Sequence, residues 1–288
     1  MKIYFAGAIT GNLSAFWRNI SLELKMGGGK PFEIIKGEAL KIFLAGANYH
    51  AFCLQNYLEK ASNNLCPYTL ESFFYMKDDL KRLIPFMSDF LLDSGAFTFM
   101  TQDKNVNFDE YLERYADFIK ANDIHKFFEL DIDSVVGYEK VKKYRLRLEE
   151  LTERPCIPVW HRSRGIDEFY RMCDEYSYVA VGGLAIKEIR QNEYKYLPML
   201  IKEAHKRKAK IHGLGFTWFN LLPKYHFDSV DSTSWTVGNR FGYIAYFDGK
   251  TMKKIDAPTG HKLSDARLVA LNNYMEWVKF QKYAEVHL

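Results

Sequence analysis

The sequence predicts an α/β fold in which parallel strands alternate with helices and close into a (β/α)8 TIM-type barrel. Short, continuously apolar runs, typical of strands buried on both faces, recur between stretches whose apolar residues are three and four apart. About eight such runs are present, which fits a closed barrel better than an open sheet. Each run carries Asp, His, Gly or Thr at its carboxyl end, where barrel active sites are built.

Strands and helices alternate along most of the chain. The expected strands are 41–47, 89–95, 126–133, 156–161, 178–184, 210–216, 227–232 and 242–248. Helical spacing predicts helices over 108–122, 138–151 and 196–209. A long helix is expected from Ser264 to about Val286, with Ser264 as its cap and Asp265 in its first turn.

We expect one domain over residues 1–288: an N-terminal elaboration at 1–40, the barrel at 41–263 and the C-terminal helix at 264–288. A hydrophobic fraction of 48% argues against general disorder. The net charge of +4 is too small to indicate a polyanionic partner by itself, and the basic clusters at 140–147 and 205–210 have the spacing of a solvated helix face.

Cysteine usage and hydropathy predict a cytoplasmic protein without a metal or other cofactor. The four cysteines form no C-x-x-C pair and no Cys/His cluster with zinc spacing, so reduced thiols are expected. The N-terminus has no cleavage-like site, and no window approaches the roughly 20 apolar residues of a membrane span. No membrane partner is expected, and the sequence leaves the oligomeric state open.

Four aspartates, Asp93, Asp131, Asp133 and Asp231, end or interrupt expected strands. Taken singly, each fits a helix cap or a turn. Together at one barrel mouth, burial and mutual repulsion would raise the pKa of some carboxyls and leave others ionised. Because a nucleophilic carboxylate and a proton-carrying carboxyl suffice to cleave a glycosidic bond, the cluster indicates glycosyl transfer.

Three motifs, spread over about half the chain, resemble tRNA-guanine transglycosylases in type and order. DSGAF at 93–97 resembles the family's DSGGF, VGGLAIKE at 181–188 resembles GGLAVGE, and DSVDSTSW at 228–235 resembles D-x-F-D-S-x-S-Y around the archaeal nucleophile. The resemblance implies a barrel enzyme that exchanges a guanine base through a covalent glycosyl-aspartate.

The resemblance also implies catalytic roles. Asp231 corresponds to the nucleophile that attacks the sugar C1′, although alignment with the bacterial FDCV form would select Asp228 instead. Asp93 corresponds to the general acid and base, and Ser94 and Gly95 of the same motif are expected to bind the substrate.

Further residues are implied to read the base. ELDID falls where the family reads guanine, so Asp131 would accept hydrogen bonds from N1 and the exocyclic amine, with Asp133 beside it. Gly182, Gly183 and Leu184 would bring backbone amides to the carbonyl side of the base, although these glycines also fit ordinary barrel packing.

Two departures from the family concern the substrate. No cysteine follows Cys173, so the family's C-x-C-x-x-C zinc site is missing, and Trp160 and His161 stand where its glutamine is expected. His161 is expected to bind the heterocycle or a phosphate, with a structural role as the alternative. Because it lacks the zinc ligands, this chain resembles the short, often phage-encoded relatives that insert 7-deazaguanines into DNA.

For that group the resemblance implies DNA as partner, a free base such as 7-cyano-7-deazaguanine as co-substrate and guanine as product, in the host cytoplasm if the protein is phage-encoded. Trp235 would stack on a base or sugar, or else belong to the core. The expected phosphate contacts are Arg162, Arg164, Lys224 and Arg240.

Three alternatives stay open. The same exchange on tRNA is the nearest one. The opening MKIYFAGAITG also resembles nucleoside deoxyribosyltransferases, which act on free nucleosides. Outside the enzymes, an inactive barrel that only binds nucleic acid is the third.

Overall fold

The computed structural model describes residues 39–61, 67–95, 98, 107–258 and 265–288. All of them belong to one compact unit, Gly37–Leu288. Apart from residues 39 and 40, the expected N-terminal elaboration lies outside the described residues.

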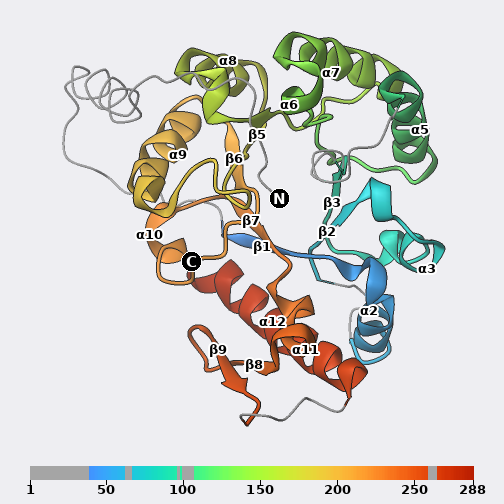
Figure 1. Cartoon of the computed structure of the whole chain (residues 1–288), viewed down its shortest axis with the longest axis vertical. Coiled ribbons are helices and arrows are strands. Elements are labelled where there is room, and N and C mark those ends of the chain that lie inside the picture. Colours follow the sequence, from blue (N-terminus) through green and yellow to red (C-terminus); the bar gives the residue numbers. More distant parts are fainter. Residues whose placement is uncertain (1–38, 62–66, 96–97, 99–106, 259–264) are drawn as a thin grey trace, which may run out of the picture. The chain divides into compact units, whose positions relative to one another are not determined.

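Seven parallel strands form one curled sheet, in the order β3-β2-β1-β7-β6-β5-β4 (Figure 1). At its centre β1 pairs with β7, and Ile42 lies opposite Val230. The strands are β1 (Lys41–Ala45), β2 (Thr69–Ser72), β3 (Phe90–Asp93), β4 (Val159–Trp160), β5 (Tyr178–Val181), β6 (Lys210–Gly213) and β7 (Ser229–Ser232). The chain therefore has an α/β fold with a curled parallel sheet.

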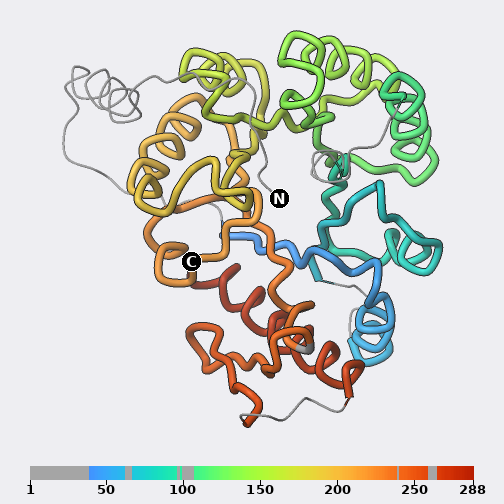
Figure 2. The backbone as a smooth tube through the Cα atoms, viewed as in Figure 1, coloured from blue at the N-terminus to red at the C-terminus, as the bar shows by residue number. Residues whose placement is uncertain are grey.

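Helices lie around the outside of the curled sheet (Figure 2). They are α2 (Ala51–Leu58), α3 (Asp78–Lys81), α5 (Phe108–Ala121), α6 (Asp133–Val136), α7 (Tyr138–Thr152), α8 (Ile166–Glu175), α9 (Leu197–Lys206), α10 (Leu222–Tyr225), α11 (Gly238–Phe241) and α12 (Ala266–His287). Single 3-10 turns follow most strands, at 47–49, 73–75, 162–164 and 234–236. No helix in the described part of the chain is long and apolar enough to span a bilayer.

The core inside the curl is built from alternate residues of neighbouring strands, because side chains along a strand point to opposite faces. Its side chains come from β1 to β5, from the segment 126–129 and from the segment that precedes β4. The cluster consists of Phe43, Ala45, Leu70, Leu91, Phe128, Ile157, Val159 and Ala180. The same alternation aims the residues at the strand ends, including Asp93, toward one side of the sheet.

The two edges of the sheet meet the segment 126–129. Phe128 N donates to Leu92 O at 2.9 Å, and Leu92 N donates to Lys126 O at 3.0 Å. On its other side Ile157 N donates to Phe127 O at 2.8 Å. Isolated parallel bridges accompany these bonds, so the segment links the end strand β3 to the chain that enters β4.

Most expected elements are present. α5, α7 and α9 confirm the three helices predicted from periodicity, and α12 confirms the C-terminal helix. Ser264 is outside the described residues, and Asp265 is the cap, accepting a hydrogen bond from Leu268 N at 2.9 Å.

Three strand assignments differ from the prediction. The run 126–133 is not a named strand, because it makes only isolated bridges at Phe127 and Phe128, and Asp133 begins α6. The run 242–248 is β8 (Tyr243–Phe247), which pairs antiparallel with β9 (Met252–Asp256) in a separate hairpin rather than joining the parallel sheet. β2 was not predicted, because its sequence, TLES, has no continuous apolar run. The three described cysteines, Cys53, Cys156 and Cys173, are free and buried.

Candidate active site

Asp93 ends β3 and Asp231 lies near the end of β7, so both carboxyls are at the carboxyl end of the sheet. Their strands are first and fourth in the sheet order, which in a flat sheet would separate them by about 14 Å. The sheet is curled rather than flat, and the charge of Asp231 is among the smaller contributions that raise the pKa of Asp93. Both aspartates therefore lie at the end of the sheet where the sequence predicted them.

Asp93 has an unusual protonation equilibrium. Burial raises the pKa of its carboxyl to about 7, hydrogen bonding from the Gly95 N–H opposes the rise, and the charges of Asp131 and Asp231 add to it. Gly95 N donates to Asp93 Oδ2 at 3.0 Å. Near neutral pH this carboxyl can therefore both hold and release a proton.

The turn after Asp93 is held by α5. Tyr111 on α5 donates its hydroxyl to Ser94 O at 2.7 Å. The Ser94 side chain is buried, and its hydroxyl has no hydrogen-bond partner among the described residues. The expected role of Ser94 and Gly95 in substrate binding stays a prediction.

Asp231 is oriented through one of its two oxygens. Gly215 N donates to Oδ1 at 2.6 Å, and His212 Nε2 lies 3.2 Å from the same atom. Gly215 has a φ of +68°, a backbone conformation that favours glycine, and a Cβ there would lie 2.9 Å from Ala185 Cβ. Among the described residues Oδ2 accepts no hydrogen bond.

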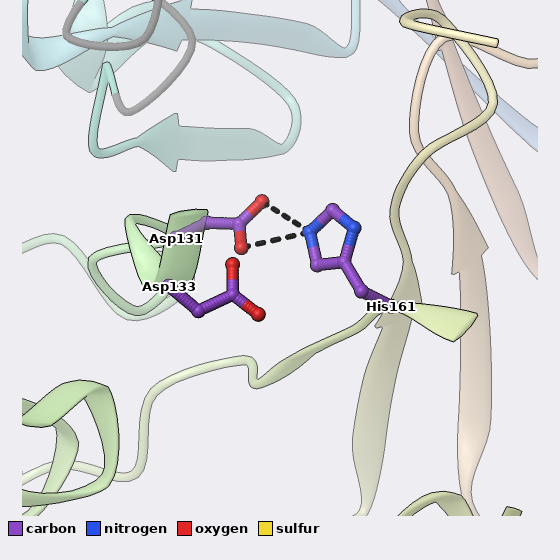
Figure 3. A group of neighbouring side chains, drawn as sticks. All are labelled: Asp131, Asp133 and His161. Atoms are coloured by element: carbon purple, nitrogen blue, oxygen red, sulfur yellow. Dashed lines mark hydrogen bonds and ion pairs between the residues drawn. The ribbon is translucent and has the colours of Figure 1, made fainter. Parts of the chain in front are cut away.

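Asp131, Asp133 and His161 form a second group at the same end of the sheet (Figure 3). Asp131 and Asp133 follow the segment 126–129, and His161 follows β4. His161 Nε2 lies 2.8 Å from both oxygens of Asp131. Sequence placed these three residues in one site, and they do lie together.

Both ring nitrogens of His161 face carboxylates, because Nδ1 lies 2.8 Å from Glu188 Oε2. Burial opposes protonation, but Asp131 and Glu188 outweigh it and raise the pKa of His161 to about 10. The imidazolium in turn lowers the pKa of Glu188 against the effect of burial. Since both N–H groups are used within the protein, His161 organises the site and does not offer a free nitrogen to a base or phosphate, which corrects that expectation.

Gly182 makes room for this imidazolium. A Cβ at Gly182 would lie 2.6 Å from His161 Cε1 and 2.9 Å from a methyl of Val159. The Gly182 N–H donates to Trp160 O at 2.9 Å within the sheet, so it is not available to a substrate. Gly183 packs against Glu188, and Leu184 is buried beside them.

Arg164 is part of the same ionic network, which corrects its expected role as a phosphate contact. Its side chain is 1% exposed and bonds Glu129 at 2.7 Å, Asp133 at 3.0 Å and Asp131 at 3.3 Å. Burial raises the pKa of Asp133, but the charges of Arg164 and then of His161 outweigh burial and lower this pKa. A guanidinium is suited to this position because its fixed donors can bond several carboxylates at once.

The group in Figure 3 could supply three metal ligands, since one atom from each residue lies within 4.8 Å of the others. Its donors are, however, already neutralised by the protonated His161 and the Arg164 guanidinium. A divalent cation would have to displace both, so the donor set fits an internal salt-bridge network better than a metal centre.

Asp228 and Trp235 do not belong to the group of acidic residues at the carboxyl end of the sheet. Asp228 precedes β7 at the opposite end of the strand from Ser232, and it bonds His205 Nε2 at 2.8 Å and Ile211 N at 2.7 Å. Trp235 is fully buried and donates Nε1 to Ala45 O at 2.8 Å. These positions argue against Asp228 as the alternative nucleophile or a substrate contact, since it connects two chain segments, and they favour the core role of Trp235 over base stacking.

The remaining expected phosphate contacts differ in their surroundings. Arg162 is mostly buried and pairs with Glu193 at 2.9 Å. Lys224 is exposed on α10, the helix that leads into the start of β7. Arg240 is exposed on α11, with its guanidinium 5.5 Å from the Phe241 ring. Only Lys224 and Arg240 of the four expected cations are exposed.

Sequence did not single out His212, Glu188 or Glu129. His212 interrupts an apolar strand in KIHGLGF, the same signal that indicated Asp93. Glu188 closes the VGGLAIKE motif, and Glu129 opens ELDID. Their role depends on partners distant in the chain, which a motif does not reveal.

Comparison with known proteins provides no family for the chain. No protein-family model matches the sequence, and no curated protein matches it significantly.

Proposed function

We propose that this chain exchanges guanine in DNA for a 7-deazaguanine base, such as 7-cyano-7-deazaguanine, through a covalent bond between Asp231 and the sugar C1′. One observation carries the proposal: two carboxyls lie at the same, carboxyl end of a curled parallel sheet in different environments. Asp93 has a pKa raised to about 7, while Asp231 is held through Oδ1 with Oδ2 unbonded among the described residues. This pairing supplies one proton carrier and one nucleophile.

In the first half of the reaction Oδ2 of Asp231 attacks C1′, and the bond from C1′ to N9 of guanine breaks. The departing guanine takes its proton from Asp93, whose pKa near 7 suits a general acid. In the second half the incoming base gives its N9 proton to Asp93. Its N9 then attacks C1′, and the ester bond to Oδ2 breaks.

Asp131 is proposed to read the base edge, with Asp133 beside it. Its oxygens accept from His161 and Arg164, but a carboxylate has about four acceptor positions, so it keeps capacity for the N1 hydrogen and exocyclic amine of guanine. The two cations fix the carboxylate in place, which favours a base with matching donors.

The choice of DNA rests on the sequence, which has no cysteine after Cys173 for the zinc site of the tRNA enzymes. Reaching C1′ in a duplex requires extrusion of the nucleotide, at a cost of a few kcal/mol. Of the two exposed cations, Arg240 on α11, which follows the carboxyl end of β7, is the proposed phosphate contact, whereas Lys224 on α10 precedes the opposite end of that strand. We propose the cytoplasm as the place of the reaction.

We also infer that the sheet closes into a (β/α)8 barrel. The segment 126–129 would be the remaining strand between β3 and β4, a position supported by its parallel bridges to Leu92 and Ile157. Closure would place Asp93, Asp131, His161 and Asp231 around one barrel mouth.

The test is a radiolabelled guanine exchange assay that offers DNA, tRNA and free nucleosides in parallel, with the covalent adduct detected on denaturing gels. DNA is expected to exchange, and Asp231→Asn is expected to abolish both exchange and adduct. Asp228→Asn is the matched control, because Asp228 precedes the same strand but lies at its other end. Retained exchange in Asp231→Asn would refute the nucleophile. If only tRNA or only free nucleosides are exchanged, then that molecule is the substrate in place of DNA. Binding of nucleic acid without any exchange would indicate a non-catalytic protein.

A further inference from the structure

A chain of hydrogen bonds runs through the interior of the sheet and ends on Asp231. The Tyr178 hydroxyl lies 2.5 Å from Ser229 Oγ, which lies 2.6 Å from His212 Nδ1. His212 Nε2 then lies 3.2 Å from Asp231 Oδ1. The four residues come from the adjacent strands β5, β6 and β7, so the sheet itself fixes their spacing.

Apolar groups enclose this chain of hydrogen bonds. His212 is fully buried, and its ring centroid lies 5.5 Å from that of Phe128 and 6.1 Å from that of Phe43. A buried polar group is costly unless its hydrogen bonds are made, so every donor in this chain needs its acceptor.

Asp231, the last residue of this chain of hydrogen bonds, determines which atom donates in each bond. An ionised Asp231 only accepts, so His212 Nε2 must carry the hydrogen. A neutral imidazole then has a bare Nδ1, which accepts from the Ser229 hydroxyl, and Ser229 accepts from Tyr178. In this arrangement every hydrogen-bond donor of the four side chains has an acceptor, and His212 is held in a single tautomer.

We propose that His212 is the positioning residue of the nucleophile. It holds Oδ1 of Asp231 through Nε2–H, together with the Gly215 N–H, so that Oδ2 is the atom that attacks and later leaves. The inference rests on the proposed function. It assigns to His212 a specific step, the release of the sugar from Asp231.

The step follows from the charge on Oδ1. While Oδ2 is bonded to C1′, Oδ1 is the carbonyl oxygen of an ester. When N9 of the incoming base bonds to C1′, the electron pair of the breaking C1′–Oδ2 bond returns to the carboxylate, and the N9 proton goes to Asp93. Two N–H donors on Oδ1 stabilise the returning charge, so loss of one slows release of the sugar more than binding of the nucleic acid.

Two substitutions separate positioning from packing. His212→Gln keeps an N–H donor near the place of Nε2, whereas the shorter His212→Asn does not reach Asp231. His205→Asn is the matched control, because His205 bonds the carboxylate of Asp228 at the other end of β7. Circular dichroism and thermal melting establish that each variant is folded.

The experiment isolates the covalent adduct and chases it with excess 7-deazaguanine base. His212→Asn is expected to slow adduct decay about tenfold or more, which is the effect of one lost hydrogen bond to a charged group. His212→Gln should recover much of the rate, His205→Asn should equal the wild type, and the affinity for DNA should stay unchanged. Wild-type decay in a folded His212→Asn variant would overturn the proposal.

A second measurement is independent of activity. Nitrogen-15 NMR of the wild-type chain should report His212 as a neutral imidazole protonated on Nε2 at neutral pH. A hydrogen on Nδ1, or an imidazolium, would overturn the inferred direction of the chain. If the wild type forms no adduct with DNA, tRNA or nucleosides, the proposed function fails, while the tautomer still decides the hydrogen-bond assignment.

Discussion

The raised pKa of Asp93 affects both its proton transfer and the stability of the fold. Its pKa is raised to about 7 by burial, and the nearby Asp131 and Asp231 add to the rise. A carboxyl whose pKa is higher in the folded chain than in the unfolded one destabilises the fold when it is ionised. Stability from this group therefore rises as the pH falls from about 7 toward the ordinary range of a carboxyl.

We expect Asp93→Asn to lower base exchange about 10²- to 10⁴-fold, the usual contribution of general acid and base catalysis. Wild-type exchange should fall as the pH rises through about 7, because the proton on Asp93 is lost. The same substitution should raise the melting temperature at about pH 8. Initial rates across a pH series and melting curves measure both effects.

The control for this prediction is Asp89→Asn. Asp89 precedes the same strand at its other end and pairs with Lys41 and Lys126. It should keep exchange while losing stability. Undiminished exchange in Asp93→Asn, or a rate without pH dependence near 7, contradicts the role of Asp93.

At the scale of elements, the short segment after β4 organises one side of the site. It carries His161 and Arg164, and these cations alternate with Asp131, Asp133 and Glu129. Arg145 from α7 completes the network on buried Glu129, at 2.7 Å. The network ties a strand end, a turn and a helix together by charge in a region with little exposure.

We expect Arg164→Met to lower the free energy of unfolding by about 3–5 kcal/mol, because it leaves buried carboxylates without their shared cation. Arg162→Met removes a neighbouring arginine that pairs only with Glu193 among the described residues, and it should cost less. Urea unfolding at neutral pH compares the two. Equal losses would mean that the three carboxylate contacts of Arg164 add little.

The same elements show what sequence can predict. α5, α7 and α9 follow from apolar spacing alone, since a helix face repeats locally. β2 was not predicted because Glu71 and Ser72 break its apolar run. β8 was assigned to the parallel sheet because a hairpin strand can be as apolar as a barrel strand. Apolar pattern predicts a strand without naming the strand it pairs with.

Site residues divide in the same way. Asp93, Asp131 and Asp231 were located by their positions at strand ends, which is a local signal. The burial of Arg164 and the double carboxylate contact of His161 depend on residues about 30 positions away in the chain. Such partners are set by tertiary packing, so sequence alone assigned these cations to a substrate.

At the scale of the whole molecule, sheet closure makes a measurable difference to backbone dynamics. In a closed barrel the amides of Leu92, Phe128, Glu129 and Ile157 are all bonded across the junction between β3 and β4. An open edge would instead exchange quickly with solvent.

We expect these four amides to exchange with deuterium as slowly as those of the central strands β1 and β7. Native-state hydrogen exchange followed by NMR measures each amide. The amide of Lys254, on the exposed strand β9, is the reference for fast exchange. Rapid exchange at the junction would mean that the curled sheet stays open there.

The pairing of β1 with β7 and the docking of α12 have a consequence for the timing of synthesis. Gln281 on α12 donates to Ile42 O across 239 residues of sequence, and it also bonds Tyr68. The first described strand thus emerges from the ribosome long before the partners that cover it. Contacts so distant in sequence form slowly. The nascent chain must keep β1 from aggregating until α12 has been translated, so we expect expression to depend on elongation rate and on chaperones.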